Sequence, residues 1–390
     1  MKPRAITGIG VASPLGTGRQ AFLEAMAASA RATPQGGRAM VPGFEAATLA
    51  HLGDKGLRSL DRLTKLLLVA TRLALHDAKL KTDGAWSAAA GVSGEHVGLV
   101  CSNAYGSLEA ITELDRVAIL EDARYINPSR FPLTVANSAA GYASIWEDLR
   151  AVNVSVSDGN CGGLDAVACA DALLEHDRAK AIVVGGVEAM SEALYLAFQK
   201  IGVLSEAAFL GEGAAMVALE TAEGAHARGA EVLAEVTGYG TAFYAPERES
   251  SLVFPSAEAA EHAVRGALAD AGILAGEIDL VVSGAAGVRA FDEAEHLGAA
   301  RALGQDGPHE HQRVPVLAPK LALGETLGAG GAMGILTAIA ALQGGARGYG
   351  VRGDVRTVRS SVRTEARTVL VTSLGYYGNA SALVMRAPSR

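Results

Sequence analysis

The chain has 390 residues, of which 49% are hydrophobic and 19% are charged. This length and composition suffice for a large buried core and fit two domains or one duplicated domain. Its 34 basic residues against 42 acidic ones, a formal net charge of −8, argue against nucleic-acid binding.

Targeting and metal signals are missing from the sequence. No apolar stretch reaches membrane-spanning length, and the N-terminus does not resemble a signal peptide. The three cysteines, Cys101, Cys161 and Cys169, have neither metal-ligand spacing nor a disulfide pattern. We therefore expect no metal, no membrane contact and a location in the reducing cytoplasm.

Short β-rich runs alternate with alanine-rich helical stretches, which predicts an α/β fold. The first series of predicted strands covers residues 5–9, 97–101, 154–156, 182–184 and 216–219. After a run at 232–238 and a loop at 242–255, a second series comprises a helix at 257–271 and strands at 280–282, 314–317, 369–372 and 382–385. The two series predict an internal pseudo-repeat, with halves at residues 1–245 and 246–390.

Gly8 and Gly10 lie at the end of the first predicted strand, and on their own they are compatible with a dinucleotide-binding turn. Ser13 stands where the fingerprint needs a third glycine, and no acidic residue closes a second strand at the expected distance. We therefore interpret the glycines as part of a structural turn and expect no cofactor.

The most informative segment is residues 157–166, which read SDGNCGGLDA. A β-rich run enters this turn of small residues, and an alanine-rich helix leaves it. Such an arrangement is typical of a nucleophile elbow, in which a tight turn lifts one side chain into a pocket beside a helix N-terminus.

The segment resembles the active-site elbow of β-ketoacyl synthases of the thiolase fold, where the lifted residue is a cysteine. Aligning Gly163 and the following helix puts Asn160, and not Cys161, at that position. Further segments that resemble this family follow in the family's order, at residues 6–16, 181–189, 211–215 and 318–331. The resemblance implies a thiolase-like fold, with two pseudo-repeated α/β halves in αβαβα layers.

Active members of the family use two histidines beside the cysteine to stabilise the enolate that forms as carbon dioxide leaves. In this chain the first histidine falls at Gly284 and the second at Glu325, whereas Lys320 matches the family's lysine. An amide cannot form a thioester, glycine has no side chain, and a carboxylate would repel the substrate carboxylate. The alignment implies the scaffold of a condensing enzyme without its catalytic set.

This triple replacement resembles chain-length factors, the β-subunits that pair with a competent ketosynthase in type II polyketide assembly. They carry an amide followed by GGLDA at the elbow, an acidic D-x-A-E run similar to residues 292–295, and a V-P-K motif close to residues 318–320. This chain differs in having Asn160 in place of glutamine, Glu325 where arginine is common, and a shortened connection at residues 204–211. These differences indicate a divergent subgroup, such as one that serves polyene products.

The resemblance implies a heterodimer with a ketosynthase α-subunit that has an intact Cys-His-His set. The pair would elongate a chain on acyl carrier protein by decarboxylative condensation of malonyl units, and this subunit would set the length of the acyl tunnel.

The gate of that tunnel is expected on a helix at the subunit interface. Alignment on the strand at 98–102 places Ser107, Ala110 and Leu114 at the gate positions, and their spacing puts them on one helical face. Ordinary helix packing is the alternative interpretation. Tyr376 and Tyr377, in a loop that resembles the family's Gly-Phe-Gly-Gly-His-Asn segment without its histidine, are expected to line the tunnel as well.

Two other functions stay open at this point. A self-sufficient condensing enzyme would use Cys161 if the elbow is shifted by one residue, although no nearby histidine motif would activate the thiol. A decarboxylase would hold a malonyl thioester with Asn160 and Lys320. Lys320 is equally well interpreted as a structural ion-pair partner, and Glu325 as a cap of the helix that follows it.

Overall fold

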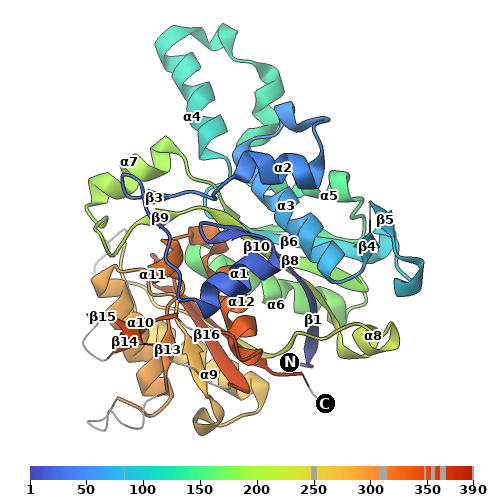
Figure 1. Ribbon diagram of the computed structural model, residues 1–390. Coiled ribbons are helices and arrows are strands. Elements are labelled where there is room, and N and C mark those ends of the chain that lie inside the picture. The colour runs from blue at the N-terminus through green and yellow to red at the C-terminus, as the bar shows by residue number, and fades with distance from the viewer. Residues whose placement is uncertain are drawn as a thin grey trace.

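The computed structural model describes residues 1–82, 84–246, 253–306, 314–346, 348–352, 356–360 and 366–388. Within these residues, one large mixed sheet of 11 strands runs through the molecule in the order β13-β12-β16-β17-β11-β1-β10-β8-β6-β7, with β2 paired to β1 (Figure 1). Its strands are β1 (Arg4–Ser13), β2 (Gly16–Thr17), β6 (Val97–Ser102), β7 (Asn153–Val156), β8 (Ala181–Glu188), β10 (Gly213–Thr221), β11 (Ala234–Phe243), β12 (Leu280–Val282), β13 (Val316–Leu317), β16 (Thr368–Leu374) and β17 (Asn379–Arg386).

Three two-stranded ladders and the helices complete the described structure. The ladders pair β3 (Arg38–Ala39) with β9 (Leu210–Gly211), β4 (Lys81–Thr82) with β5 (Ala85–Trp86), and β14 (Gly348–Arg352) with β15 (Arg356–Ser360). The helices are α1 (Arg19–Ala27), α2 (Phe44–Leu52), α3 (Arg62–Asp77), α4 (Leu108–Val117), α5 (Ser138–Glu147), α6 (Gly162–Glu175), α7 (Glu192–Ile201), α8 (Ala222–Ala227), α9 (Ala257–Ala271), α10 (Arg289–Ala302), α11 (Lys320–Leu323) and α12 (Gly330–Leu342). None of the described helices is long and apolar enough to cross a membrane.

The two series of strands form a topological repeat. From the middle of the sheet outward, the first series runs β1-β10-β8-β6-β7 and the second runs β11-β17-β16-β12-β13. In both series the two inner pairings are antiparallel and the two outer ones are parallel. The predicted pseudo-repeat is therefore confirmed, whereas its boundary near residue 245 stays a prediction because the two halves share one sheet.

The helices form three layers around the two halves of the sheet (Figure 1). Helices α3 and α5 cover the outer face of the first half, and α9 and α10 cover that of the second. Helices α6 and α12 lie between the halves and contact each other. All of α12 except Leu342 is buried, as expected for a helix that is apolar on every side. These three helical layers, with a half of the sheet between each two, form the predicted αβαβα arrangement.

The glycines of the first strand have a packing role. A Cβ added at Gly10 would lie 1.8 Å from the carbonyl oxygen of Ala70, and one at Gly8 would lie 2.6 Å from that of Ala74, both in α3. The prediction of a turn at these glycines was wrong, because both lie inside β1 and let the backbone of α3 pack directly on the strand.

One further boundary differs from the prediction. Strand β11 continues to Phe243, five residues beyond the predicted end, because its ladder with β17 extends as far as the Phe243–Asn379 pair. The loop expected at 242–255 therefore starts later, and residues 247–252 of it lie outside the described part of the chain.

Helix α4 begins an arm that projects from the body of the molecule (Figure 1). The chain continues from α4 through a π-helical turn at Ala118–Asp122 and returns along Pro128–Thr134. Four large apolar side chains of this arm, those of Ile119, Leu120, Tyr125 and Phe131, are 64–79% exposed. The arm thus presents an apolar surface that the chain itself does not cover.

Candidate functional site

The elbow lies at the junction of β7 and α6. After β7 ends at Val156, a short 3-10 turn at Gly159–Cys161 carries Asn160 into the interior, where only 3% of the residue is exposed. The helix that follows starts at Gly162. A Cβ at Gly163 would lie 2.6 Å from the backbone nitrogen of Ala332, so this glycine lets the start of α6 pack against α12.

The side chain of Asn160 faces two acceptors. Its Nδ2 donates to Glu325 Oε2 at 3.4 Å and to the carbonyl oxygen of Leu374 at 3.3 Å. Because an ionised carboxylate and a carbonyl only accept, the amide nitrogen has to face them. Oδ1 of Asn160 is buried without a hydrogen-bond partner among the described residues.

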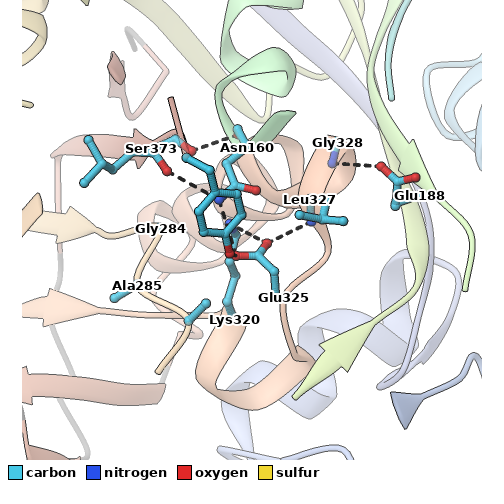
Figure 2. Close-up of polar contacts among 12 residues, drawn as sticks. Asn160, Glu188, Gly284, Ala285, Lys320, Glu325, Leu327, Gly328 and Ser373 are labelled. Atoms are coloured by element: carbon cyan, nitrogen blue, oxygen red, sulfur yellow. Dashed lines mark hydrogen bonds and ion pairs between the residues drawn. The ribbon is translucent and has the colours of Figure 1, made fainter. Parts of the chain in front are cut away.

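Lys320 and Glu325 form a buried ion pair below the elbow (Figure 2). The Nζ of Lys320, at the start of α11, lies 2.8 Å from Glu325 Oε1. The chain between them turns at Gly324, whose φ of +88° favours glycine. Only 1% of Lys320 and 4% of Glu325 are exposed. The earlier interpretation of Lys320 as a structural ion-pair partner is supported by this contact.

Glu325 has further partners on both carboxylate oxygens. Oε1 accepts the N–H of Leu327 at 2.8 Å, and Oε2 accepts the hydroxyl of Tyr376 at 3.1 Å. Burial and the neighbouring Glu325 carboxylate raise the pKa of Tyr376 well above its ordinary value. The backbone of Glu325 pairs with the end of the shortened 204–211 connection, because its N–H donates to Phe209 O and its carbonyl accepts from Gly211 N.

Gly284, which aligns with the first histidine of the family, lies against a neighbouring carboxylate. The N–H of Gly284 donates to Glu295 Oε1 at 2.7 Å, and a Cβ at Gly284 would lie 3.2 Å from Glu295 Oε2. One turn earlier on α10, Asp292 accepts the N–H groups of Ala286 and Gly287 at 3.0 and 2.9 Å. Burial, with Glu295 and Glu325 nearby, raises the pKa of Asp292 to about 6.

Glu188 is a member of the site that the sequence argument did not single out. It ends β8 and is 1% exposed, and its Oε2 accepts N–H groups from Ala104 at 2.9 Å and Gly328 at 3.2 Å. Burial, and to a smaller extent the Glu325 carboxylate, raises its pKa to about 8. The signal in the sequence was an acidic residue at the end of an apolar strand.

The structure places Cys161 away from any role as a nucleophile. It is fully buried, and its Sγ donates to the carbonyl oxygen of Ser373 at 3.4 Å. Burial, together with the carboxylates of Asp165 and Asp158, raises the pKa of the thiol well above its usual range. A thiol that stays protonated at neutral pH and lies under the elbow does not favour the shifted register.

The residues expected at the tunnel lie on one side of this site. Ser107 caps α4 through its hydroxyl, which accepts the N–H of Ala110 at 3.3 Å. Ser107 and Ala110 are buried, and Leu114 is half-buried. Ser107 therefore has a capping role, and its role in a gate stays a prediction.

The two tyrosines lie close to the base of α4. Tyr377 is exposed, with its hydroxyl 3.5 Å from that of Tyr105, two residues before Ser107. Tyr376 packs edge-on against Phe198 and Phe291, with ring centroids 6.1 and 4.8 Å away. The structure thus brings the two predicted tunnel segments together, while the gating role itself stays a prediction.

Taken together, the contacts make a buried polar cluster around an asparagine, in which, among the described residues, Asn160 Oδ1 has no hydrogen-bond partner and Lys320 Nζ has the Glu325 ion pair alone. Glu325 contacts both Asn160 and Lys320, and the Ser373 hydroxyl donates to the Asn160 carbonyl at 2.8 Å (Figure 2). No group of three or more His, Cys, Asp or Glu side chains is placed to bind a metal ion in the part of the chain that the structure describes. At the elbow itself, the side chain in this cluster is the amide of Asn160.

Two pseudo-repeated halves around a buried elbow define the class of thiolase-fold ketosynthases. The family models Beta-ketoacyl synthase, N-terminal domain and Beta-ketoacyl synthase, C-terminal domain match residues 1–225 and 233–347. The chain belongs to the β-ketoacyl synthase family.

Relatives described as polyketide ketoacyl synthases, one of them a beta subunit, match over nearly the full chain. A polyketide beta-ketoacyl synthase 2 of Streptomyces coelicolor is 31% identical over 98% of this chain and 94% of that protein. The tetracenomycin polyketide synthase ketoacyl synthase beta subunit of Streptomyces glaucescens is 30% identical over 98% of each chain. Among solved structures, the ishigamide ketosynthase/chain length factor superposes with a TM-score of 0.84 over 100% of both chains, at 22% identity.

Proposed function

We propose that this chain is a chain-length-factor-like subunit that pairs with an active ketosynthase and does not itself condense. The observation that carries the proposal is the ion pair between Lys320 and Glu325, 2.8 Å apart, at the position of the family's second histidine. With Asn160 at the elbow, Gly284 in place of the first histidine and Glu325 in place of the second, none of the three positions carries the cysteine or histidine side chain that condensation in the family uses. The names of the full-length relatives, a ketoacyl synthase β-subunit among them, support the same function.

Two surfaces support association with a partner. The arm exposes Ile119, Leu120, Tyr125 and Phe131. Strand β7 is the last strand of the sheet, so one side of its backbone pairs with no other strand among the described residues. An obligate interface commonly buries more than about 2,000 Å² in total. We expect a heterodimer that uses the arm and β7, with homodimers when the chain is produced alone.

In this proposal the pair elongates a chain held on acyl carrier protein, with the chemistry at the partner's cysteine, and this subunit shapes the far end of the tunnel. A cytoplasmic location is part of the proposal, and the three free cysteines support a reducing compartment. A polyene product stays a prediction.

The experiment combines the chain with a ketosynthase that has an intact Cys-His-His set. Sedimentation should show a heterodimer, and intact mass after incubation with acyl-carrier protein should show an adduct on the partner alone. Products should need both subunits and should disappear with a partner variant that lacks its catalytic cysteine. An acyl adduct on Cys161, carbon dioxide release from malonyl-carrier protein by this chain alone, or a monomer that ignores its partner would contradict the proposal.

A further inference from the structure

The carboxylate of Glu325 is held as a bound ligand would be. Oε1 is 2.8 Å from the Lys320 ammonium and 2.8 Å from the Leu327 N–H, whereas Oε2 accepts from the Tyr376 hydroxyl and the Asn160 amide. The donors come from separate parts of the chain: the elbow, α11, the loop before α12 and the loop after β16 (Figure 2). They are a built cradle for one carboxylate.

The cradle owes its shape to more than Glu325. Lys320 is fixed against Gly330, where an added Cβ would lie 2.5 Å from Lys320 Cε, and the Leu327 N–H belongs to the backbone that leads into α12. Asn160 is also anchored through Leu374 O, and its Oδ1 remains a buried acceptor without a described partner. Removing the Glu325 side chain would therefore leave a buried ammonium and three further donors without their acceptor, which is unfavourable until another anion enters.

We propose that the donors around Glu325 form a binding site for a small carboxylate, which the chain fills with its own Glu325 side chain. In the native protein the internal carboxylate excludes external ones. When the side chain is truncated, the same donors bind a carboxylate of the size of acetate. The proposed carboxylate site is inferred from the contacts of Glu325 alone. Its consequence, that this subunit leaves the malonyl carboxylate to the partner's site, rests on the proposed function.

The test is rescue by acetate. Glu325→Ala removes the γ-methylene and the carboxylate, which is the fragment that acetate replaces. Thermal unfolding of the full chain is followed while sodium acetate is titrated against sodium chloride at constant ionic strength. The melting temperature of Glu325→Ala should lie below that of the wild type and should rise with acetate to saturation. Acetamide, the neutral isostere, should have no such effect.

Glu325→Gln is the matched control. It loses the same charge but keeps the space filled, so acetate should not raise its melting temperature, nor that of the wild type. Equal shifts in all three proteins would show a general salt effect and overturn the proposal, as would a folded Glu325→Ala that does not respond.

If Glu325→Ala does not fold in chloride, refolding from urea decides the question. A higher yield in acetate than in acetamide supports the site, and equal yields refute it. Failure of acetate rescue would leave the proposed function standing, because pairing and product formation test that function separately.

Discussion

The pKa of Glu188 makes a quantitative prediction about stability. Burial and the nearby Glu325 carboxylate raise this pKa from an ordinary 4.5 to about 8. Between these two values the folded chain keeps a proton on Glu188 that the unfolded chain has lost. The stability that the protonated carboxyl contributes is therefore complete below pH 4.5 and is lost as the pH rises to about 8. At about 1.4 kcal/mol per pH unit, the loss amounts to at most ~5 kcal/mol.

Glu188→Gln tests this account, because its amide oxygen can still accept from Ala104 and Gly328 while its charge never changes. The unfolding free energy should fall with pH more steeply in the wild type than in the variant, by up to ~1.4 kcal/mol per pH unit. Urea unfolding followed by circular dichroism at several pH values between 5 and 8.5 measures both slopes. Asp292 and Asp165, whose pKa values are also raised, to about 6 and about 7, are present in both proteins and cancel in the comparison.

The control is Glu192→Gln, which removes an exposed carboxylate paired with Arg38 at 2.7 Å and should leave the slope unchanged. Parallel pH curves for the wild type and Glu188→Gln would mean that Glu188 is already ionised in the folded protein. The electrostatic account of the elbow cluster would then be wrong.

Two further predictions concern the elbow thiol and the arm. Cys161 is fully buried and its pKa is raised, so it should escape iodoacetamide in the native chain and react after unfolding, which peptide mass mapping would detect. Cys161→Ala should leave the activity of the reconstituted pair intact, as measured by product yield. Labelling of Cys161 in the native chain would contradict the first prediction. Ala110→Phe or Leu114→Phe should shift the products of the pair to shorter chains at near-normal early rates, since overpacking costs on the order of 1–3 kcal/mol. Ser107→Phe should also lose the cap of α4, at about 1 kcal/mol, which thermal melting would detect. Thr112→Phe, at an exposed position of α4, is the control, and an unchanged distribution from well-folded, well-paired variants would place the tunnel end elsewhere.

The sequence alignment at the elbow rests on a glycine that the packing of the helices requires. The glycine that fixes the alignment, Gly163, is required where the ends of α6 and α12 meet. The same kind of argument failed at Gly8 and Gly10, since glycine permits both a turn and a close approach of a helix, and the local sequence does not distinguish them. The β-rich runs of the sequence sufficed to place the main strands along the chain. The C-terminal end of β11 was missed because the length of this strand depends on its partner β17.

Part of the site could not be predicted from the sequence. Lys320 and Glu325 were each singled out, one as an ion-pair partner and one as a helix cap. The ion pair agrees with the contacts, whereas Glu325 precedes the N-cap Thr326 and accepts the N–H of Leu327 without being the cap itself. The pairing of Lys320 with Glu325 depends on the turn at Gly324. The approach of Glu188 to this pair depends on strand β8, which is far away in the sequence. Contacts of this kind are set by tertiary packing, for which one sequence carries no local signal.

The buried ion pair gives a physical reason for the combination of residues at the elbow. Lys320 is 1% exposed, so an unpaired ammonium there would be strongly unfavourable. A histidine at position 325 would leave the ammonium charge to be neutralised by other means, whereas Glu325 neutralises it directly. The second oxygen of Glu325 accepts hydrogen bonds from the Tyr376 hydroxyl and the Asn160 amide. Breaking a buried pair by removing one member typically costs about 3–5 kcal/mol, so neither residue can easily change alone. Lys320 and Glu325 therefore depend on each other, and a change at one position is expected to require a compensating change at the other.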